Sequence, residues 1–129
     1  MTTYSGSCHC RAVRFEADGP LEDLEVCNCS ICRRTGYVHW YLEPDRFRLE
    51  SGEAALASYR FGSRVAQHLF CRTCGISPFR RARSDPHKID VNVRCLEGVE
   101  PDALSVTPFD GRNWEETYAR LRPGRPSRD

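Results

Sequence analysis

Eight cysteines in a chain of 129 residues constrain this protein more than any other feature of its sequence. Seven of them fall in three short groups: Cys8-His9-Cys10, residues 27–32 with three cysteines, and Cys71-Arg72-Thr73-Cys74. Cysteines at such spacings either ligate a metal or form disulfides. The first residues lack the basic segment and the apolar segment of a signal peptide. We therefore expect a reducing cytoplasm, where metal ligation is favoured over disulfides.

The spacing divides these cysteines into four and three. A tetrahedral zinc is typically held by two short pairs that lie far apart in the sequence. The two outer groups, about 60 residues apart, fit that description, and we predict that they hold a structural zinc. This four-cysteine cluster consists of Cys8, Cys10, Cys71 and Cys74.

The three-cysteine cluster consists of Cys27, Cys29 and Cys32. Three protein ligands and one open position are the pattern of a catalytic zinc, so the sequence predicts two zinc ions with different roles. Cys95 stands alone, and three roles compete for it: a buried core thiol, a fourth ligand of the three-cysteine cluster, or a pocket residue. A redox role for Cys71 and Cys74 is disfavoured, because Gly75, Ser77 and Pro78 make a poor helix start.

Alternation of apolar and polar residues predicts a mainly β fold. The expected strands cover residues 13–17, 37–42, 47–49, 56–61, 65–70 and 89–93, with a hairpin turn at Gly62-Ser63. A short C-terminal helix is expected from Asn113 to Leu121, because its apolar residues recur at spacings of three and four and its first turn is acidic. His39, His68 and the other two histidines lack the spacing of zinc ligands, so none is assigned to a metal.

Length and composition set further limits. The chain suits one domain, which we assign to residues 1–119, and the Pro-, Gly- and Arg-rich residues 120–129 are expected to be a disordered tail. The whole chain has 19 basic and 18 acidic residues and a net charge of +1, so nucleic acid is not an expected partner. No apolar run approaches the roughly 18–20 residues of a membrane helix, so no membrane partner is expected.

The cysteine groups and their neighbours resemble the glutathione-dependent formaldehyde-activating enzyme family, which includes centromere protein V. The resemblance rests on residues 6–10, 12–15, 27–33, 70–75 and 109–115, and spans roughly Tyr4 to Glu116. It implies an Mss4-like β-rich fold, a structural zinc on the four-cysteine cluster and a second zinc on the three-cysteine cluster. It also implies an activity that joins glutathione to formaldehyde, classed by its reverse direction as a carbon–sulfur lyase.

Two details of the resemblance qualify this expectation. The family usually has Gly after the first cysteine pair, whereas this chain has Arg11. Residues 29–32 and 66–68 are closest to the centromere protein V branch. The alternative function is therefore a non-catalytic, zinc-stabilised binding module, and a third hypothesis is a thiol-metabolising enzyme that acts on another adduct.

A substrate site next to the three-cysteine cluster needs positive charge, because three thiolates and one entering thiolate exceed the charge of a zinc ion. Arg33 and Arg34 follow Cys32 directly and are candidates to bind a glutathione carboxylate; the competing interpretation is two solvated surface arginines. The aromatic strand at residues 37–42 either walls the pocket or packs in the core. The expected partners are glutathione or a similar small thiol and a small electrophile.

Overall fold

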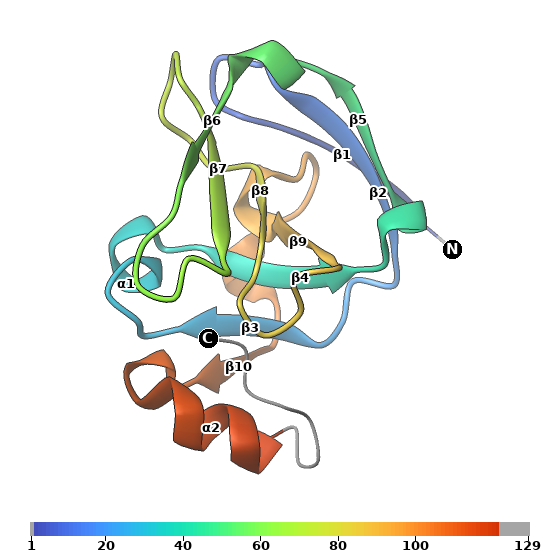
Figure 1. Ribbon diagram of the computed structural model, residues 1–129. Coiled ribbons are helices and arrows are strands. Elements are labelled where there is room, and N and C mark those ends of the chain that lie inside the picture. The colour runs from blue at the N-terminus through green and yellow to red at the C-terminus, as the bar shows by residue number, and fades with distance from the viewer. Residues whose placement is uncertain (1, 122–129) are drawn as a thin grey trace.

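The computed structural model describes residues 2–121, which form two β-sheets and a short C-terminal helix (Figure 1). The strands are β1 (Thr2–Ser7), β2 (Arg14–Gly19), β3 (Leu24–Cys27), β4 (Val38–Leu42), β5 (Phe47–Ser51), β6 (Leu56–Tyr59), β7 (Gln67–Cys71), β8 (Phe79–Arg81), β9 (Ile89–Asn92) and β10 (Val106–Phe109). The helices are α1 (Cys32–Thr35) and α2 (Trp114–Leu121), with 3-10 turns at Pro44–Arg46, Glu53–Ala55, Val93–Cys95, Pro101–Ala103 and Gly111–Asn113.

The smaller sheet has the strand order β1-β2-β5, and the larger has the order β10-β3-β4-β9-β8-β7-β6. The β10–β3 pair is parallel, and the remaining pairs are antiparallel. The mainly β fold and the short C-terminal helix predicted from the sequence are therefore confirmed. The predicted hairpin is the antiparallel β6–β7 pair, although these strands end at Tyr59 and resume only at Gln67. Strands β1, β3, β8 and β10 were not predicted.

The hydrophobic core lies between the two sheets. Phe15 of β2 stacks on Phe47 of β5 with ring centroids 5.4 Å apart, and it meets Phe79 of β8 at 6.5 Å. Phe15 and Phe79 are buried within one apolar cluster that also includes Val91 of β9. Each such side chain contributes about 1.5–3 kcal/mol when it is removed from water, so this contact holds the sheets together.

Strands β4, β9 and β8 present chemically different faces. Trp40, Val91 and Phe79 lie side by side across these strands and point into the core. The opposite face carries a row of polar side chains that continues onto β7, each opposite the next in strand register. The row is Tyr41, Asp90, Arg80 and His68. Because side chains alternate along a strand, a single set of strands supports both the core and a polar cavity.

Two aromatic residues of the C-terminal helix α2 pack on each other: the rings of Trp114 and Tyr118 stack with centroids 4.6 Å apart. Arg120 and Leu121, the first two residues of the predicted tail, form the end of α2. The rest of that predicted tail, residues 122–129, lies outside the described residues. Within residues 2–121, no helix has both the length and the apolar character needed to cross a membrane.

Candidate metal centres and the adjoining cavity

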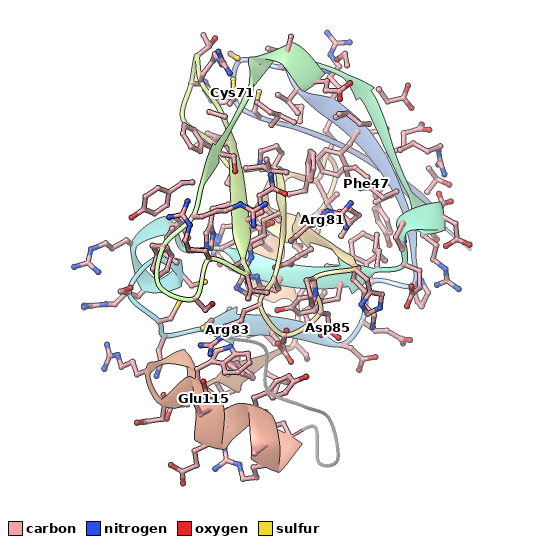
Figure 2. All side chains as sticks on the ribbon, viewed as in Figure 1. Phe47, Cys71, Arg81, Arg83, Asp85 and Glu115 are labelled. Atoms are coloured by element: carbon pink, nitrogen blue, oxygen red, sulfur yellow. The ribbon has the colours of Figure 1, made fainter. Side chains whose placement is uncertain are left out.

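The four-cysteine cluster forms where the turn after β1 meets the turn after β7. One of its members, Cys71, is labelled at the top of the molecule in Figure 2. Its four Sγ atoms all lie within 4.8 Å of one another. The Sγ atom of Cys10 is 3.7 Å from those of Cys8 and Cys71. Four sulfurs arranged tetrahedrally at a zinc–sulfur distance of about 2.3 Å are about 3.8 Å apart. The thiols therefore fit a zinc ion in both number and separation.

Tight turns bring these thiols together. The N–H of Gly75 donates to the carbonyl oxygen of Cys71 at 2.7 Å, and Gly75 adopts a left-handed φ of 80°. In the other turn, the N–H of Arg11 donates to the carbonyl oxygen of Cys8 at 3.2 Å, and Arg11 has a φ of 68°. A residue with a side chain adopts this conformation at a cost of about 1–2 kcal/mol. Arg11 thus makes the left-handed turn that glycine favours, and the departure from the family pattern leaves the turn intact.

The three-cysteine cluster forms at the end of β3 and the start of α1. Cys27 ends the strand, Cys32 begins the helix, Cys29 lies between them, and the three Sγ atoms are within 4.8 Å of one another. The N–H groups of Cys29 and Cys32 point at the sulfurs of Cys27 and Cys29, at 3.5 and 3.4 Å. Hydrogen bonds from the Cys27 and Cys32 thiols hold the pKa of Cys29 well below its usual range, whereas the contacts of Cys32 with Cys27 and Cys29 raise the pKa of Cys32. A metal that binds all three as thiolates must displace the shared protons.

The segment after β10 supports the three-cysteine cluster from behind. Asn28, between the first two cysteines, donates from Nδ2 to Asp110 at 2.9 Å, and its Oδ1 accepts the N–H of Arg112 at 3.1 Å. Its N–H donates to the carbonyl oxygen of Phe109 at 3.3 Å, and its own carbonyl oxygen accepts from Nε of Arg112 at 3.1 Å. Both polar groups of the side chain and both polar groups of the backbone are therefore paired with one segment, which fixes the loop that carries the thiols.

Gly111 sits against the same loop. A Cβ atom at this position would lie 2.4 Å from Sγ of Cys27 and 2.9 Å from Cβ of Cys29. The absence of a side chain is thus required for the close approach of this turn to the cluster. The motif at residues 109–115 is part of the resemblance seen in the sequence, but its role as a support becomes visible only in the fold.

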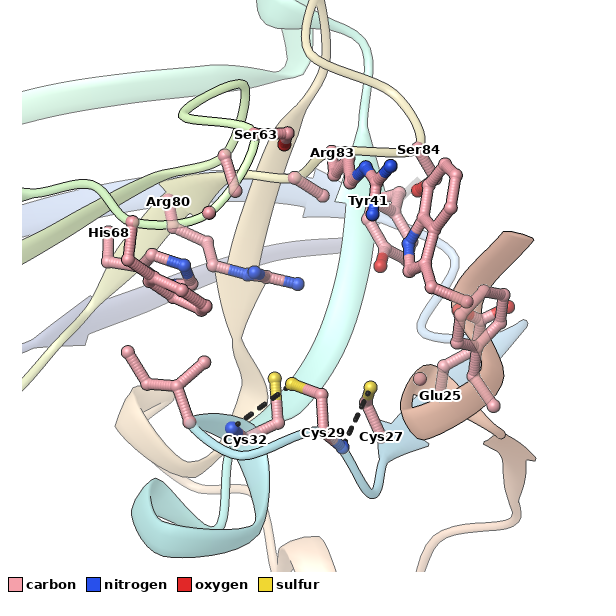
Figure 3. Close-up of a pocket in the computed structure, with 18 residues that line it drawn as sticks. Glu25, Cys27, Cys29, Cys32, Tyr41, Ser63, His68, Arg80, Arg83 and Ser84 are labelled. Atoms are coloured by element: carbon pink, nitrogen blue, oxygen red, sulfur yellow. Dashed lines mark hydrogen bonds between the residues drawn. The ribbon is translucent and has the colours of Figure 1, made fainter. Parts of the chain in front are cut away.

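A cavity of about 170 Å³ opens over the three-cysteine cluster (Figure 3). All three cysteines of the cluster line it. Aromatic side chains from distant segments, among them Tyr41, Phe61 and Trp114, form its walls. Polar side chains also face it, including those of Glu25, Ser63 and Ser84. A tetrahedral ion on the four-cysteine cluster would take all its ligands from the protein, whereas an ion on the three-cysteine cluster would have one position left, toward the cavity.

The cations of the cavity differ from those proposed on the sequence. Arg33 and Arg34 lie on α1 with exposed side chains, and neither lines the cavity. Arg34 donates to the carbonyl oxygen of Ser30 at 2.7 Å. Arg80 and Arg83 line the cavity instead. A contact of Arg33 and Arg34 with a glutathione carboxylate stays a prediction, and such a contact would have to lie outside the cavity.

Arg83 forms one side of the cavity together with the C-terminal helix. Its guanidinium lies over the ring of Trp114, 3.7 Å from the centroid, and its Nη2 atom is 2.6 Å from a carboxylate oxygen of Glu115. Cation–π contacts and ion pairs of this kind hold a long side chain in one orientation. Trp114 is therefore both an anchor of α2 and a wall of the cavity.

Cys95 lies apart from the three-cysteine cluster. Its Sγ atom is 3.8 Å from the carbonyl oxygen of Ser77, and it packs against the hydrophobic core. Burial raises the pKa of Cys95 to about 12, so the thiol is protonated at neutral pH. Within residues 2–121, Cys95 joins neither candidate metal cluster, which favours the interpretation as a core thiol.

The strand at residues 37–42 serves both of the roles considered for it. Trp40 packs into the core and meets Tyr4 edge-on at 5.7 Å, whereas Tyr41 lines the cavity. His68 also lines the cavity and stacks on Phe61 at 5.5 Å. Burial, and next the charge of Arg80, lower the pKa of His68 to about 4, so it is neutral at pH 7. Among the described residues, no histidine belongs to either metal cluster.

The family model described as glutathione-dependent formaldehyde-activating enzyme matches residues 3–108. A crystal structure of a Rhodobacter sphaeroides protein is similar, with 42% sequence identity and a TM-score of 0.74, covering 81% of this chain and 97% of that one. The family match includes all seven cysteines of the two clusters.

Proposed function

The chain belongs to the glutathione-dependent formaldehyde-activating enzyme family, and on that basis we propose a zinc-dependent enzyme of the carbon–sulfur lyase type. In this proposal, the thiolate of glutathione adds to formaldehyde or a related small electrophile. The observation that carries the proposal is the difference between the two clusters. Four sulfurs complete one of them, whereas three sulfurs line a cavity in the other.

Cys27, Cys29 and Cys32 would hold the catalytic zinc. The donor set fits: three thiols lie within 4.8 Å of one another, and backbone N–H groups point at two of the sulfurs. The ion, when bound, favours the deprotonated form of an entering thiol, since thiolate is the form that metals bind. The four-cysteine cluster would hold a structural zinc that joins the turn after β1 to the turn after β7.

The cavity supplies the surroundings that the addition needs. Phe61, Tyr41 and Trp114 give the cavity apolar walls, and electrostatic interactions are stronger beside apolar walls than in bulk water. The buried guanidinium of Arg80 supplies positive charge to the same cavity. The aromatic and polar side chains of the cavity orient the thiol beside an uncharged carbonyl compound.

The reaction is balanced without a redox partner. The thiolate sulfur attacks the carbonyl carbon, a carbon–sulfur bond forms, and the π electrons of the C=O bond move onto oxygen. That oxygen then takes a proton from water, giving the S-hydroxymethyl derivative of the thiol. The reverse sequence breaks the carbon–sulfur bond.

Calorimetry with glutathione and S-methylglutathione on the zinc-loaded protein tests this proposal. The methylated peptide keeps both carboxylates but cannot form a thiolate. We expect glutathione alone to bind, to release a proton and to bind more weakly below neutral pH. Equal binding of both peptides would exclude sulfur ligation, and binding of neither would favour the non-catalytic zinc-stabilised module.

A further inference from the structure

Arg80 of β8 is charged and buried, and it lines the cavity. Its Nε atom donates to Oδ2 of Asp90 at 2.7 Å, and Asp90 on β9 is fully buried. Figure 3 shows the guanidinium of Arg80 directed into the space over the sulfurs of Cys29 and Cys32. A fixed cation therefore faces the open side of the three-cysteine cluster.

Further groups hold Asp90, and through it Arg80, in place. Nδ1 of His39 is 2.7 Å from the same carboxylate oxygen, a distance typical of an N–H that donates to a carboxylate. The hydroxyl of Tyr37 donates to the carbonyl oxygen of Asp90 at 2.5 Å. Burial alone would raise the pKa of Asp90, but His39 and Arg80 lower it overall. Asp90 is therefore an ionised anchor at neutral pH.

One end of the guanidinium is left for a ligand. Nε contacts Asp90 and Nη2 lies 3.2 Å from Nδ1 of His39, while Nη1 has no hydrogen-bond partner in the described part of the chain. Guanidinium N–H groups only donate. The free end of Arg80 is thus suited to an anion in the cavity.

The stability of the fold does not by itself explain the buried pair of Arg80 and Asp90. A buried ion pair is often no more stable than apolar side chains of the same volume, and the opposite face of the same strands carries such side chains, Phe79 and Val91. A charged pair aimed at a cavity is, however, what preorganised electrostatic stabilisation of a reacting anion requires.

We infer that Arg80 is a catalytic residue of the proposed reaction and that Asp90 and His39 are its positioning residues. The inference rests on the proposed function. As the carbon–sulfur bond forms and the carbonyl π bond breaks, negative charge moves from sulfur to oxygen. The Nη1 N–H groups of Arg80 bind that oxyanion until it takes a proton from water.

Steady-state kinetics of adduct formation and breakdown, with glutathione binding measured by calorimetry, test this role. Loss of one oxyanion donor typically lowers kcat about 10²–10³-fold. We expect that loss for Arg80→Gln, with the affinity for glutathione changed by less than about threefold. Asp90→Asn keeps the cation but weakens its anchor, so kcat should fall by about tenfold to a hundredfold. Arg80→Lys, which keeps the charge, should recover part of the loss.

Arg81→Gln is the matched control. Arg81 follows Arg80 on the same strand, does not line the cavity, and bonds to the carbonyl oxygens of Pro86 and His87, so this variant should retain wild-type values. Because Arg80→Gln leaves Asp90 buried without its partner, the double variant Arg80→Gln/Asp90→Asn removes both charges together. It should melt as a folded protein and show the same loss of kcat as Arg80→Gln.

Formate, a one-carbon anion whose two oxygens accept hydrogen bonds, gives a readout that needs no turnover. Line broadening of ¹³C-formate on the zinc-loaded protein should show binding that Arg80→Gln weakens at least about tenfold. If the wild type binds formate in this way but forms no thiol adduct, the anion site stands and the proposed function fails. Unchanged kcat and formate binding in Arg80→Gln, or loss of glutathione binding alone, would overturn the inference.

Discussion

Replacement of Gly111 by alanine tests the link between the C-terminal segment and the three-cysteine cluster. The new Cβ atom would lie 2.4 Å from Sγ of Cys27. Non-bonded heavy atoms rest about 3.5–4.0 Å apart, so one of the two groups must move by more than about 1 Å. Metal–ligand distances are held to about 0.2 Å. The displacement is therefore several times larger than a metal site at Cys27 tolerates.

We expect Gly111→Ala to fold and to lose about one equivalent of zinc while it retains the other. Overpacking of this kind costs about 1–3 kcal/mol of the free energy of unfolding. In a domain of this size, that lowers Tm on the order of 5–10 °C. Metal analysis after dialysis gives the zinc per chain, and circular dichroism gives the melting temperature.

Gly98→Ala is the matched control. Gly98 has a φ of 72°, and a Cβ atom there would meet nothing within 4 Å. Its replacement costs about 1–2 kcal/mol through backbone strain alone, so Tm should fall while both zinc ions stay bound. If Gly111→Ala also holds two zinc ions and has the same Tm as Gly98→Ala, the C-terminal segment does not support the three-cysteine cluster and the reasoning is refuted.

Graded chelation should remove about one equivalent of zinc before the fold melts, because the three-cysteine cluster has fewer protein ligands; simultaneous loss of both ions with unfolding would contradict the division into two sites. Circular dichroism should show that Cys8→Ser and Cys74→Ser damage folding whereas Cys29→Ser stays folded, and equal destabilisation by all three would mean that both sites are structural. The pKa of His68 is lowered to about 4 from an ordinary value near 6.5, so the unfolded chain binds more protons between these values. The free energy of unfolding should therefore fall as the pH drops from about 6.5 to 4. Denaturant melts at several pH values should show that this free energy changes less with pH in His68→Gln than in the wild type. An equal change with pH in both proteins would exclude His68 as the cause.

The metal clusters were predictable because ligand spacing is a local property of the sequence. The turn at Cys71-Arg72-Thr73-Cys74 needs only a glycine after it, and Gly75 has the left-handed conformation that such a turn uses. The expected strands were also recognisable where apolar and polar residues alternate. In β1, by contrast, four of the six residues are Ser or Thr, and β8 has only three residues, two of them arginine. Alternation cannot mark such strands.

The cavity was less predictable, because its residues are brought together by strand register. Arg80 reads as one surface arginine among many, and only its position opposite Asp90 on β9 shows that it is buried. Arg33 and Arg34 were chosen because they follow Cys32, but α1 carries them on exposed positions outside the cavity. Closeness in sequence was enough to predict which cysteines cluster, whereas the lining of the cavity depends on strand register.

The hydrogen bonds between Asn28 and the segment after β10 span about 80 residues of sequence, which sets an order of assembly during synthesis. A chain made from its N-terminus exposes Cys27, Cys29 and Cys32 long before Asp110 and Gly111 leave the ribosome. The four-cysteine cluster, in contrast, has all its thiols once Cys74 has emerged. The nascent chain can therefore assemble the four-cysteine cluster while the thiols of the three-cysteine cluster are still open to oxidation and to competing metals, and the cavity cannot be complete before Trp114 has been made.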